Sequence, residues 1–220
     1  SYGVLEHIED VVNFLAGIRN HLISSGVAIL SVPDCAEDIV QGDPGMLLHE
    51  HYQYFTETSL RRTLQQSGFR LQAIKPAGYG RALYVSASRD SGVVSQPPTQ
   101  SELELLREYG GRCERFRKVV STRAADLASS GGALGLYCPG RALGVLPLNI
   151  EARFFDDAKN LHGMYYPPFR NVIESRENLF VRPPAELWIM SKTFGARIAE
   201  GIAPSLPDTR LVLVDNLLHY

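Results

Sequence analysis

Short apolar strands alternate with helical segments along this chain, and this alternation constrains the fold more than any other sequence feature. Residues 27–32 form a continuous apolar run that Pro33 ends. Such a run is typical of a strand buried on both faces of a parallel sheet. A strand–turn–helix rhythm recurs in the second half, which predicts a parallel α/β domain. Its strands are predicted at residues 133–137, 152–155, 187–190 and 210–214, and its helices from Arg141 and over 194–202.

Residues 1–90 are predicted to combine helices, a long loop and two closing strands. Apolar residues recur at the helical period from Val4 to Leu22, which predicts one amphipathic helix over that span. Residues 34–55 lack periodicity and are predicted to form a loop with at most a short helix; a loop this long is usually functional. Thr56 suits the N-cap of the next helix, which Gly68 ends. The closing strands, a pair that could be antiparallel, are predicted at residues 71–75 and 82–88.

Residues 91–100 contain glycine and paired prolines and have the composition of a linker. We therefore predict two domains, residues 1–95 and 96–220. Ser101 is the predicted cap of a long helix that reaches about Leu127, and a glycine pair in its middle is expected to bend or break it.

Composition excludes several classes of protein. With 45% hydrophobic and 21% charged residues the chain is ordinary globular material, and a formal charge of −2 without a basic stripe argues against a nucleic-acid partner. Three cysteines without CxxC spacing argue against a disulfide framework or a structural zinc site and favour the reducing cytoplasm. No apolar run is long enough for a membrane span. Because the chain starts at Ser1 inside a predicted element, we expect it to be part of a longer protein.

Two segments of the first domain carry a family resemblance. The first is Val4-Leu5-Glu6-His7, and the second runs through Tyr54-Phe55-Thr56, Ser59-Leu60 and Ser67-Gly68-Phe69. In this order and spacing they resemble the C-terminal half of a class I S-adenosylmethionine-dependent methyltransferase domain. The resemblance implies an α/β fold class, in which the later strands of a Rossmann-like methyltransferase domain precede a second Rossmann-like domain.

The resemblance also implies S-adenosylmethionine as the methyl donor. The family holds this cofactor with a glycine-rich turn after its first strand and an acidic residue at the end of its second, and neither pattern lies in these residues. We expect most of the donor site to lie outside this chain, with Glu6 and His7 as the candidates within it. Activity is therefore not expected from the chain alone.

Residues 101–220 resemble the C-terminal domain of methyltransferases that methylate carbon in keto sugars. The resemblance is carried by the long helix and by Gly131-Gly132-Ala133-Leu134-Gly135, Phe155-Asp156-Asp157 and Gly163-Met164-Tyr165-Tyr166-Pro167-Pro168. It implies a two-domain enzyme whose second domain helps to hold a nucleotide-linked sugar. The predicted substrate-binding residues are Tyr54, Arg141, which could meet a phosphate, and Tyr165, on which a sugar or base could stack.

Methylation of carbon requires a base, because a proton beside a carbonyl must leave before the new bond can form. In the resembling sugar C-methyltransferases a His-Glu-His loop has this role, and it maps onto His49, Glu50 and His51. His51 is the predicted base, with Glu50 as its partner or as an acceptor for a substrate hydroxyl. His7 falls where those enzymes carry another active-site histidine.

A binding module is the alternative to an enzyme. The chain has Leu48 where those enzymes tend to have tyrosine and Gly3 where they have asparagine. In other methyltransferases a histidine before Tyr-Phe packs structurally, as His51 could. The first domain could then be a degenerate remnant, and the second could bind a sugar nucleotide or another protein.

Two pairs of site residues have further alternatives. His49 and His51 could both bind a metal ion, but no third ligand is placed by spacing, so we predict no metal site. Glu6 and His7 could lie on the polar side of the first helix and only cap or solvate its first turn. We favour that interpretation for Glu6.

Asp156 and Asp157 end a predicted strand, where a nucleotide-binding fold places its ribose acceptor. The GxGxxG pattern is missing, so the second domain is predicted to bind no nucleotide of its own. The expected partner is a small-molecule substrate, without nucleic acid or membrane. Without the earlier strands of the resembling domain, the strand at residues 27–32 would have one unpaired side and an exposed apolar face. The chain alone is then expected to be poorly soluble or to form a homo-oligomer such as a dimer.

Overall fold

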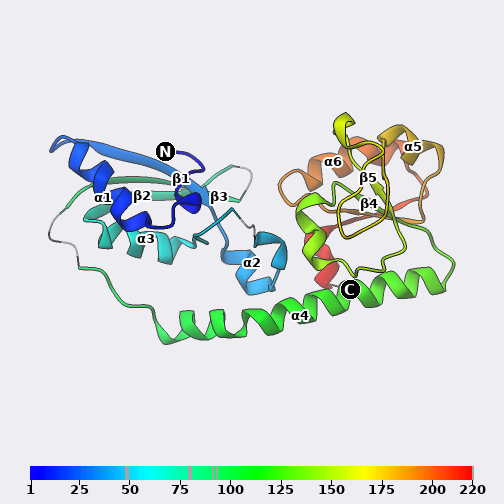
Figure 1. Ribbon diagram of the computed structural model, residues 1–220, viewed down its shortest axis with the longest axis horizontal. Helices are drawn as coiled ribbons and strands as arrows, with labels where there is room; N and C mark the ends of the chain where they lie inside the picture. Colours follow the sequence, from blue (N-terminus) through cyan, green and yellow to red (C-terminus); the bar gives the residue numbers. More distant parts are fainter. Residues whose placement is uncertain (48–49, 79–80, 91, 93, 220) are drawn as a thin grey trace. The chain divides into compact units, whose positions relative to one another are not determined.

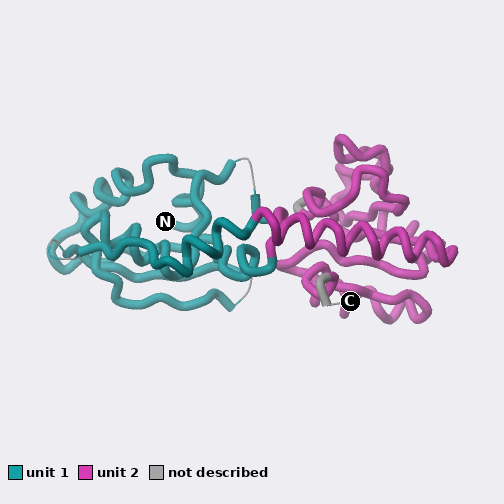
Figure 2. Tube along the Cα trace, turned by 90° about the horizontal axis from the view of Figure 1, so that it is seen from below, with its two compact units in different colours: residues 1–41, 46–109 teal, residues 42–45, 110–220 magenta. Residues whose placement is uncertain are grey.

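The computed structural model describes residues 1–47, 50–78, 81–90, 92 and 94–219 (Figure 1). They form two compact units (Figure 2). The first unit comprises Ser1–Gln41 and Met46–Tyr109, and the second comprises Gly42–Gly45 and Gly110–Tyr220. The division falls inside one long helix, α4 (Gln100–Ser129).

The first unit is built on an antiparallel sheet of three strands in the order β1-β3-β2. These are β1 (Val27–Pro33), β2 (Phe69–Pro76) and β3 (Ala82–Arg89), and the helices α1 (Val11–His21) and α3 (Glu57–Gln66) cover one face of the sheet (Figure 1). The antiparallel pairing of the closing strands is confirmed. A buried core of Leu15, Leu30, Leu60, Leu64 and Phe69 joins the helices to the sheet.

Strand β1 differs from its prediction. Its residues alternate between the core and the other face, so Leu30 is 1% exposed while Val27 and Ile29 are 42% and 47% exposed. The expectation of a strand buried on both faces is therefore wrong for this segment. The continuous apolar run conceals a period of two, which is the pattern of an antiparallel strand with one face covered.

The predicted helix from Val4 to Leu22 is also wrong at its start. A 3₁₀ turn, η1 (Leu5–His7), comes first, Ile8 is extended, and α1 begins only at Val11. Asp10 is the N-cap, since its carboxylate accepts a hydrogen bond of 3.1 Å from the backbone N–H of Asn13. A cap at this position starts the helix and leaves the preceding residues free to turn.

The segment after β1 contains α2 (Ala36–Gln41) and a 3₁₀ turn, η2 (Pro44–Met46), in keeping with a loop that holds a short helix. The predicted cap at Thr56 is confirmed, because Thr56 and Ser59 bond reciprocally in a capping box. Gly68, with φ of +75°, follows the end of α3 in the left-handed conformation that glycine adopts most readily.

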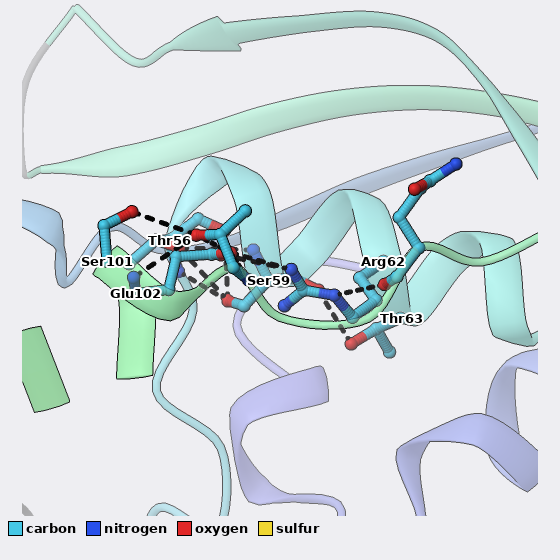
Figure 3. Close-up of polar contacts among 8 residues, drawn as sticks. Thr56, Ser59, Arg62, Thr63, Ser101 and Glu102 are labelled. Atoms are coloured by element: carbon cyan, nitrogen blue, oxygen red, sulfur yellow. Dashed lines mark hydrogen bonds and ion pairs between the residues drawn. The ribbon is translucent and has the colours of Figure 1, made fainter. Parts of the chain in front are cut away.

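Helix α4 is capped by Thr99 rather than by Ser101. The Thr99 hydroxyl accepts from the backbone N–H of Glu102, and the Glu102 carboxylate accepts from the backbone N–H of Thr99 at 2.7 Å. Arg62 of α3 donates to both Glu102 oxygens at 3.1 Å and so ties the start of α4 to the first unit (Figure 3). The helix is continuous through its glycine pair, because helix formers over its length outweigh a cost of about 1 kcal/mol per glycine.

The second unit contains a parallel sheet in the order β6-β5-β4-β7-β8, which confirms the predicted parallel domain. The strands are β4 (Leu134–Tyr137), β5 (Arg153–Phe155), β6 (Ile173–Glu174), β7 (Glu186–Ile189) and β8 (Arg210–Leu213). The helices are α5 (Arg176–Val181) and α6 (Gly195–Ile202), with short 3₁₀ turns η3 (Gly140–Val145), η4 (Lys159–Leu161), η5 (Ala203–Ser205) and η6 (Val214–His219). An α-helix was expected from Arg141, but a 3₁₀ turn forms there, and β6 and α5 are too short to show a period in the sequence.

Side chains of the central strands alternate between two cores. Leu136 and Trp188 pack with Phe116 and Val120 of α4 on one face. Tyr137 and Ile189 pack on the other face, which α5 and α6 cover (Figure 1). The fold is therefore α/β and Rossmann-like in this unit, as predicted. Among the residues described, no helix combines the length and the apolar character that crossing a bilayer requires.

Candidate functional site

The first residues of the chain lie along the outer edge of β1. The backbone N–H of Gly3 donates to the Ser31 carbonyl at 3.0 Å, and Ser31 donates to Ser1 at 2.9 Å, in a parallel arrangement. The chain therefore runs past the carboxyl end of β1 before it turns into η1. Glu6 and His7 lie at that end of β1.

The segment around residues 50–53 docks onto this turn. The backbone N–H groups of Tyr52 and Gln53 both donate to the Glu6 carbonyl, at 2.8 and 3.1 Å. The Gln53 amide donates to the carbonyls of Ile8 and Glu9 at 3.2 and 3.1 Å. Two segments that are far apart in the sequence are thus held together by hydrogen bonds to the main chain.

The hydrogen bond that His7 makes fixes its tautomer. Its Nδ1 lies 3.0 Å from the backbone carbonyl of Glu50, and a carbonyl can only accept, so Nδ1 carries a hydrogen and donates it. In neutral His7 the free lone pair is therefore on Nε2. That atom faces the Glu6 carboxylate, with Oε1 at 4.0 Å.

Glu6 is buried, which overturns the expectation that it lies on the polar side of a helix. The residue is 4% exposed, and its Oε2 has no hydrogen-bond partner among the described residues. The error follows from the helix prediction. A 3₁₀ turn directs the neighbouring Leu5 and Glu6 both inward, which an amphipathic α-helix starting at Val4 would not do.

His51 completes a cluster with these two residues. Its ring lies edge-on to that of His7 with centroids 4.8 Å apart, and 6.1 Å from the ring of Tyr54. One side-chain nitrogen or oxygen from each of Glu6, His7 and His51 can be chosen so that all three lie within 4.8 Å of one another. We call this the Glu6–His7–His51 cluster.

The other predicted residues of the His-Glu-His loop occupy different positions. His49 lies outside the described residues, as does Leu48. Glu50 is exposed, and its backbone carbonyl is the group that meets His7. Glu6 is thus the buried carboxylate beside the histidines, and no feature of local sequence distinguishes it from a surface glutamate.

Cys35 lies near this cluster, but its thiol is unreactive. It follows β1, is 5% exposed, and its backbone N–H donates to the Phe55 carbonyl at 2.8 Å. Burial, reinforced by the neighbouring carboxylates of Asp38 and Asp34, raises the pKa of its thiol to about 12. The thiol is therefore protonated at neutral pH and is no nucleophile.

The remaining candidates belong to the second unit. Tyr165 is 58% exposed and pairs with Val172 through an isolated bridge, while the side chain of Arg141 lies outside the described part of the structure. At the end of β5, the Asp157 carboxylate accepts from the Tyr137 hydroxyl at 2.6 Å and from Arg176. A nucleotide-binding fold presents a ribose acceptor at this position. Here the carboxylate is hydrogen-bonded to Tyr137 and Arg176 instead.

Cys138, at the turn after β4, is also unreactive. Its φ of +52° marks the turn, and burial together with Asp156 and Asp157 raises the pKa of its thiol to about 12. Burial likewise raises the pKa of Tyr137, to which the hydrogen bond with Asp157 adds. Both groups are neutral at physiological pH.

Comparison with known proteins gives one family likeness, in the first part of the chain. No curated protein shows a significant match to the chain. Residues 1–74, about a third of the chain, match the family model described as a methyltransferase domain, and this range includes Glu6, His7, His51 and Tyr54. The match supports a methyltransferase domain in the first part of the chain.

Proposed function

We propose that this chain provides the acceptor side of an S-adenosylmethionine-dependent methyltransferase. The observation that supports this most is the Glu6–His7–His51 cluster at the carboxyl end of β1, inside the range that matches a methyltransferase domain. Two imidazoles and a buried carboxylate beside each other are groups that can take and hold a proton near neutral pH. A site that must activate its acceptor needs groups of this kind.

The reaction we propose is methylation of a carbon beside a carbonyl. His51 removes the proton from that carbon and holds it, which leaves an enolate. When S-adenosylmethionine is bound, it would supply the methyl group for this enolate, with S-adenosylhomocysteine as the leaving group. The Glu6 carboxylate, near His7, stabilises positive charge on the paired imidazoles as the proton arrives. Tyr54, whose ring centroid lies 6.1 Å from that of His51, would contact the acceptor.

A nucleotide-linked keto sugar is the acceptor that we propose. The support is the resemblance of residues 101–220 to the second domain of sugar C-methyltransferases. Arg141 would meet a phosphate of such a substrate, and the exposed ring of Tyr165 would stack on its sugar or base.

The described residues of the first unit do not fit the donor itself. All three strands of its sheet are antiparallel to their neighbours, and none leads through a glycine-rich turn into a helix N-terminus. Such a turn is the usual cradle for a nucleotide cofactor at a strand end. We therefore assign no cofactor contact to this chain and derive only what its residues do to the acceptor.

The proposed base is tested by His51→Gln, with His21→Gln as a matched control. His21 lies on α1, is exposed, and has its Nδ1 2.8 Å from the carbonyl of Gly17, far in sequence from the cluster. In a form of the protein that also carries the donor site, we expect His51→Gln to lower kcat for transfer of labelled methyl to a keto-sugar nucleotide about 100-fold. Equal rates for both variants would contradict the assignment of His51.

Calorimetry separates an enzyme from a binding module. A methyltransferase should bind both S-adenosylmethionine and the sugar nucleotide in the form of the protein that carries the donor site. Binding of the sugar nucleotide alone would support a module and would refute the proposed transfer.

A further inference from the structure

We infer that the Glu6–His7–His51 cluster is a binding site for a divalent transition-metal ion. The three side chains offer two imidazole nitrogens and one carboxylate oxygen, all within 4.8 Å of one another. A central ion would need these ligand atoms at about 2.0–2.2 Å, so the three side chains would have to draw together when it binds. The sequence suggested His49 and His51 as metal ligands; of these the cluster contains His51, and the fold adds Glu6 and His7.

His7 is prepared for such a role by its hydrogen bond. Histidines that bind metals commonly donate their second ring N–H to a carbonyl or carboxylate, which orients the ring and fixes the tautomer. His7 donates from Nδ1 to the Glu50 carbonyl at 3.0 Å, so Nε2 presents its lone pair toward Glu6.

The environment of Glu6 favours a bound cation. Its carboxylate is buried, and Oε2 has no hydrogen-bond partner among the described residues. A buried carboxylate oxygen without a donor is costly, and the free lone pair of neutral His7 cannot donate to it. A cation that Glu6, His7 and His51 share would neutralise the Glu6 carboxylate and bind the free lone pair of His7.

The ligand set selects the class of metal. Two histidines and one glutamate form a known catalytic zinc set, with a further position open, and they also suit other first-row ions. Magnesium and calcium prefer sites built from oxygen alone. We therefore expect binding of Zn²⁺ and Co²⁺ and no competition from Mg²⁺.

A metal ion here has a regulatory consequence that rests on the proposed function. The ion would occupy a ring nitrogen of His51 and so remove the lone pair that the base uses. Metal binding and proton abstraction would exclude each other, and Zn²⁺ would inhibit methyl transfer. The metal site itself rests only on the geometry of the cluster.

Titration of this chain with Co²⁺, followed by visible absorption and by displacement with Zn²⁺, tests the site. We expect one equivalent to bind, and we expect Glu6→Gln, His7→Ala and His51→Ala each to weaken binding about tenfold or more. His21→Ala, at a histidine outside the cluster, should bind like the parent chain. Circular dichroism of each variant separates loss of ligand from loss of fold, and His7→Gln replaces His7→Ala if the latter unfolds.

Absence of Co²⁺ binding to the folded chain would overturn the inference, and so would binding that survives Glu6→Gln and His51→Ala. Because the titration needs no substrate, its result is independent of the methyl-transfer assay. Metal binding without any methyl transfer, in a form of the protein that also carries the donor site, would refute the proposed function and leave the metal site. Methyl transfer that Zn²⁺ does not affect, in a protein that binds Zn²⁺ at the cluster, would refute the inhibition.

Discussion

The carboxylate of Glu6 lies 4.0 Å from Nε2 of His7, at the carboxyl end of β1. The contact depends on a loop distant in sequence, since backbone groups of Glu50, Tyr52 and Gln53 hold η1 in place. It makes Glu6, rather than the exposed Glu50, the carboxylate that lies beside the histidines.

This relationship predicts different effects for two equivalent substitutions. Glu6→Gln should lower kcat for methyl transfer about tenfold or more with little change in KM, because it removes the charge that stabilises a protonated imidazole. Glu50→Gln keeps the backbone carbonyl that His7 uses, so it should leave His7 oriented. Steady-state kinetics of both variants, in a form of the protein that also carries the donor site, measure the difference. A larger loss of kcat for Glu50→Gln would show that the side chain of Glu50 is the true partner.

Gly42→Ala should destabilise the second unit. Gly42 has φ of +73°, and a Cβ there would lie 2.3 Å from Cβ and 2.4 Å from the backbone carbon of Arg112 in α4. Strain and overpacking together should cost about 2 kcal/mol or more, or about 5 °C in the unfolding midpoint. Gly17→Ala is the control, since its Cβ meets nothing within 4 Å in a helix, and it should be neutral or stabilising. Thermal unfolding that ranks Gly42→Ala level with Gly17→Ala would contradict this packing.

The pair Arg153–Glu174 should make the stability of the second unit depend on pH. Arg153 donates to the two Glu174 oxygens at 2.7 and 2.6 Å, and these bonds lower the pKa of that carboxyl. A carboxyl whose pKa is lowered in the folded state stabilises the fold above its unfolded pKa of about 4.3, and the contribution is lost as pH falls below that value.

The measurement is urea unfolding of the parent chain and of Glu174→Gln between pH 7 and pH 3. The difference in unfolding free energy, roughly 1 kcal/mol at pH 7, should shrink as the pH falls. In an Arg153→Met background the same substitution should show no such dependence on pH. A constant difference at every pH would mean that the pair does not lower the pKa.

The uncovered face of the first sheet should promote self-association. Val27, Ile29 and Tyr84 are each more than 40% exposed on the face opposite the helices. Ile29→Lys should lower the association measured by sedimentation at increasing concentration, because it charges this patch. Ile23→Lys, at an exposed isoleucine that follows α1, should have no such effect. A parent chain that stays monomeric throughout the concentration range would refute the prediction.

Sequence patterns predicted best the features that depend on interactions between residues close together in the chain. Thr56 caps α3 because a side-chain oxygen at that position bonds to the backbone three residues later, whatever surrounds it. The apolar runs at β4 and β7 predicted strands buried on both faces, and both strands are buried throughout. The apolar run of β1 has the same pattern, yet one face of β1 is exposed to solvent. The residues of a strand do not determine which elements pack against its two faces.

By itself the sequence determined the parallel α/β second unit, the antiparallel closing strands and the choice of His7 and His51 as candidates. Only the tertiary structure decided that Glu6 is buried beside them and that Glu50 contributes its backbone. Residue type and spacing predict hydrogen bonds and burial that depend on residues close by in the chain. The environment of Glu6 depends instead on backbone donors more than forty residues away, which reach it only when the chain has folded.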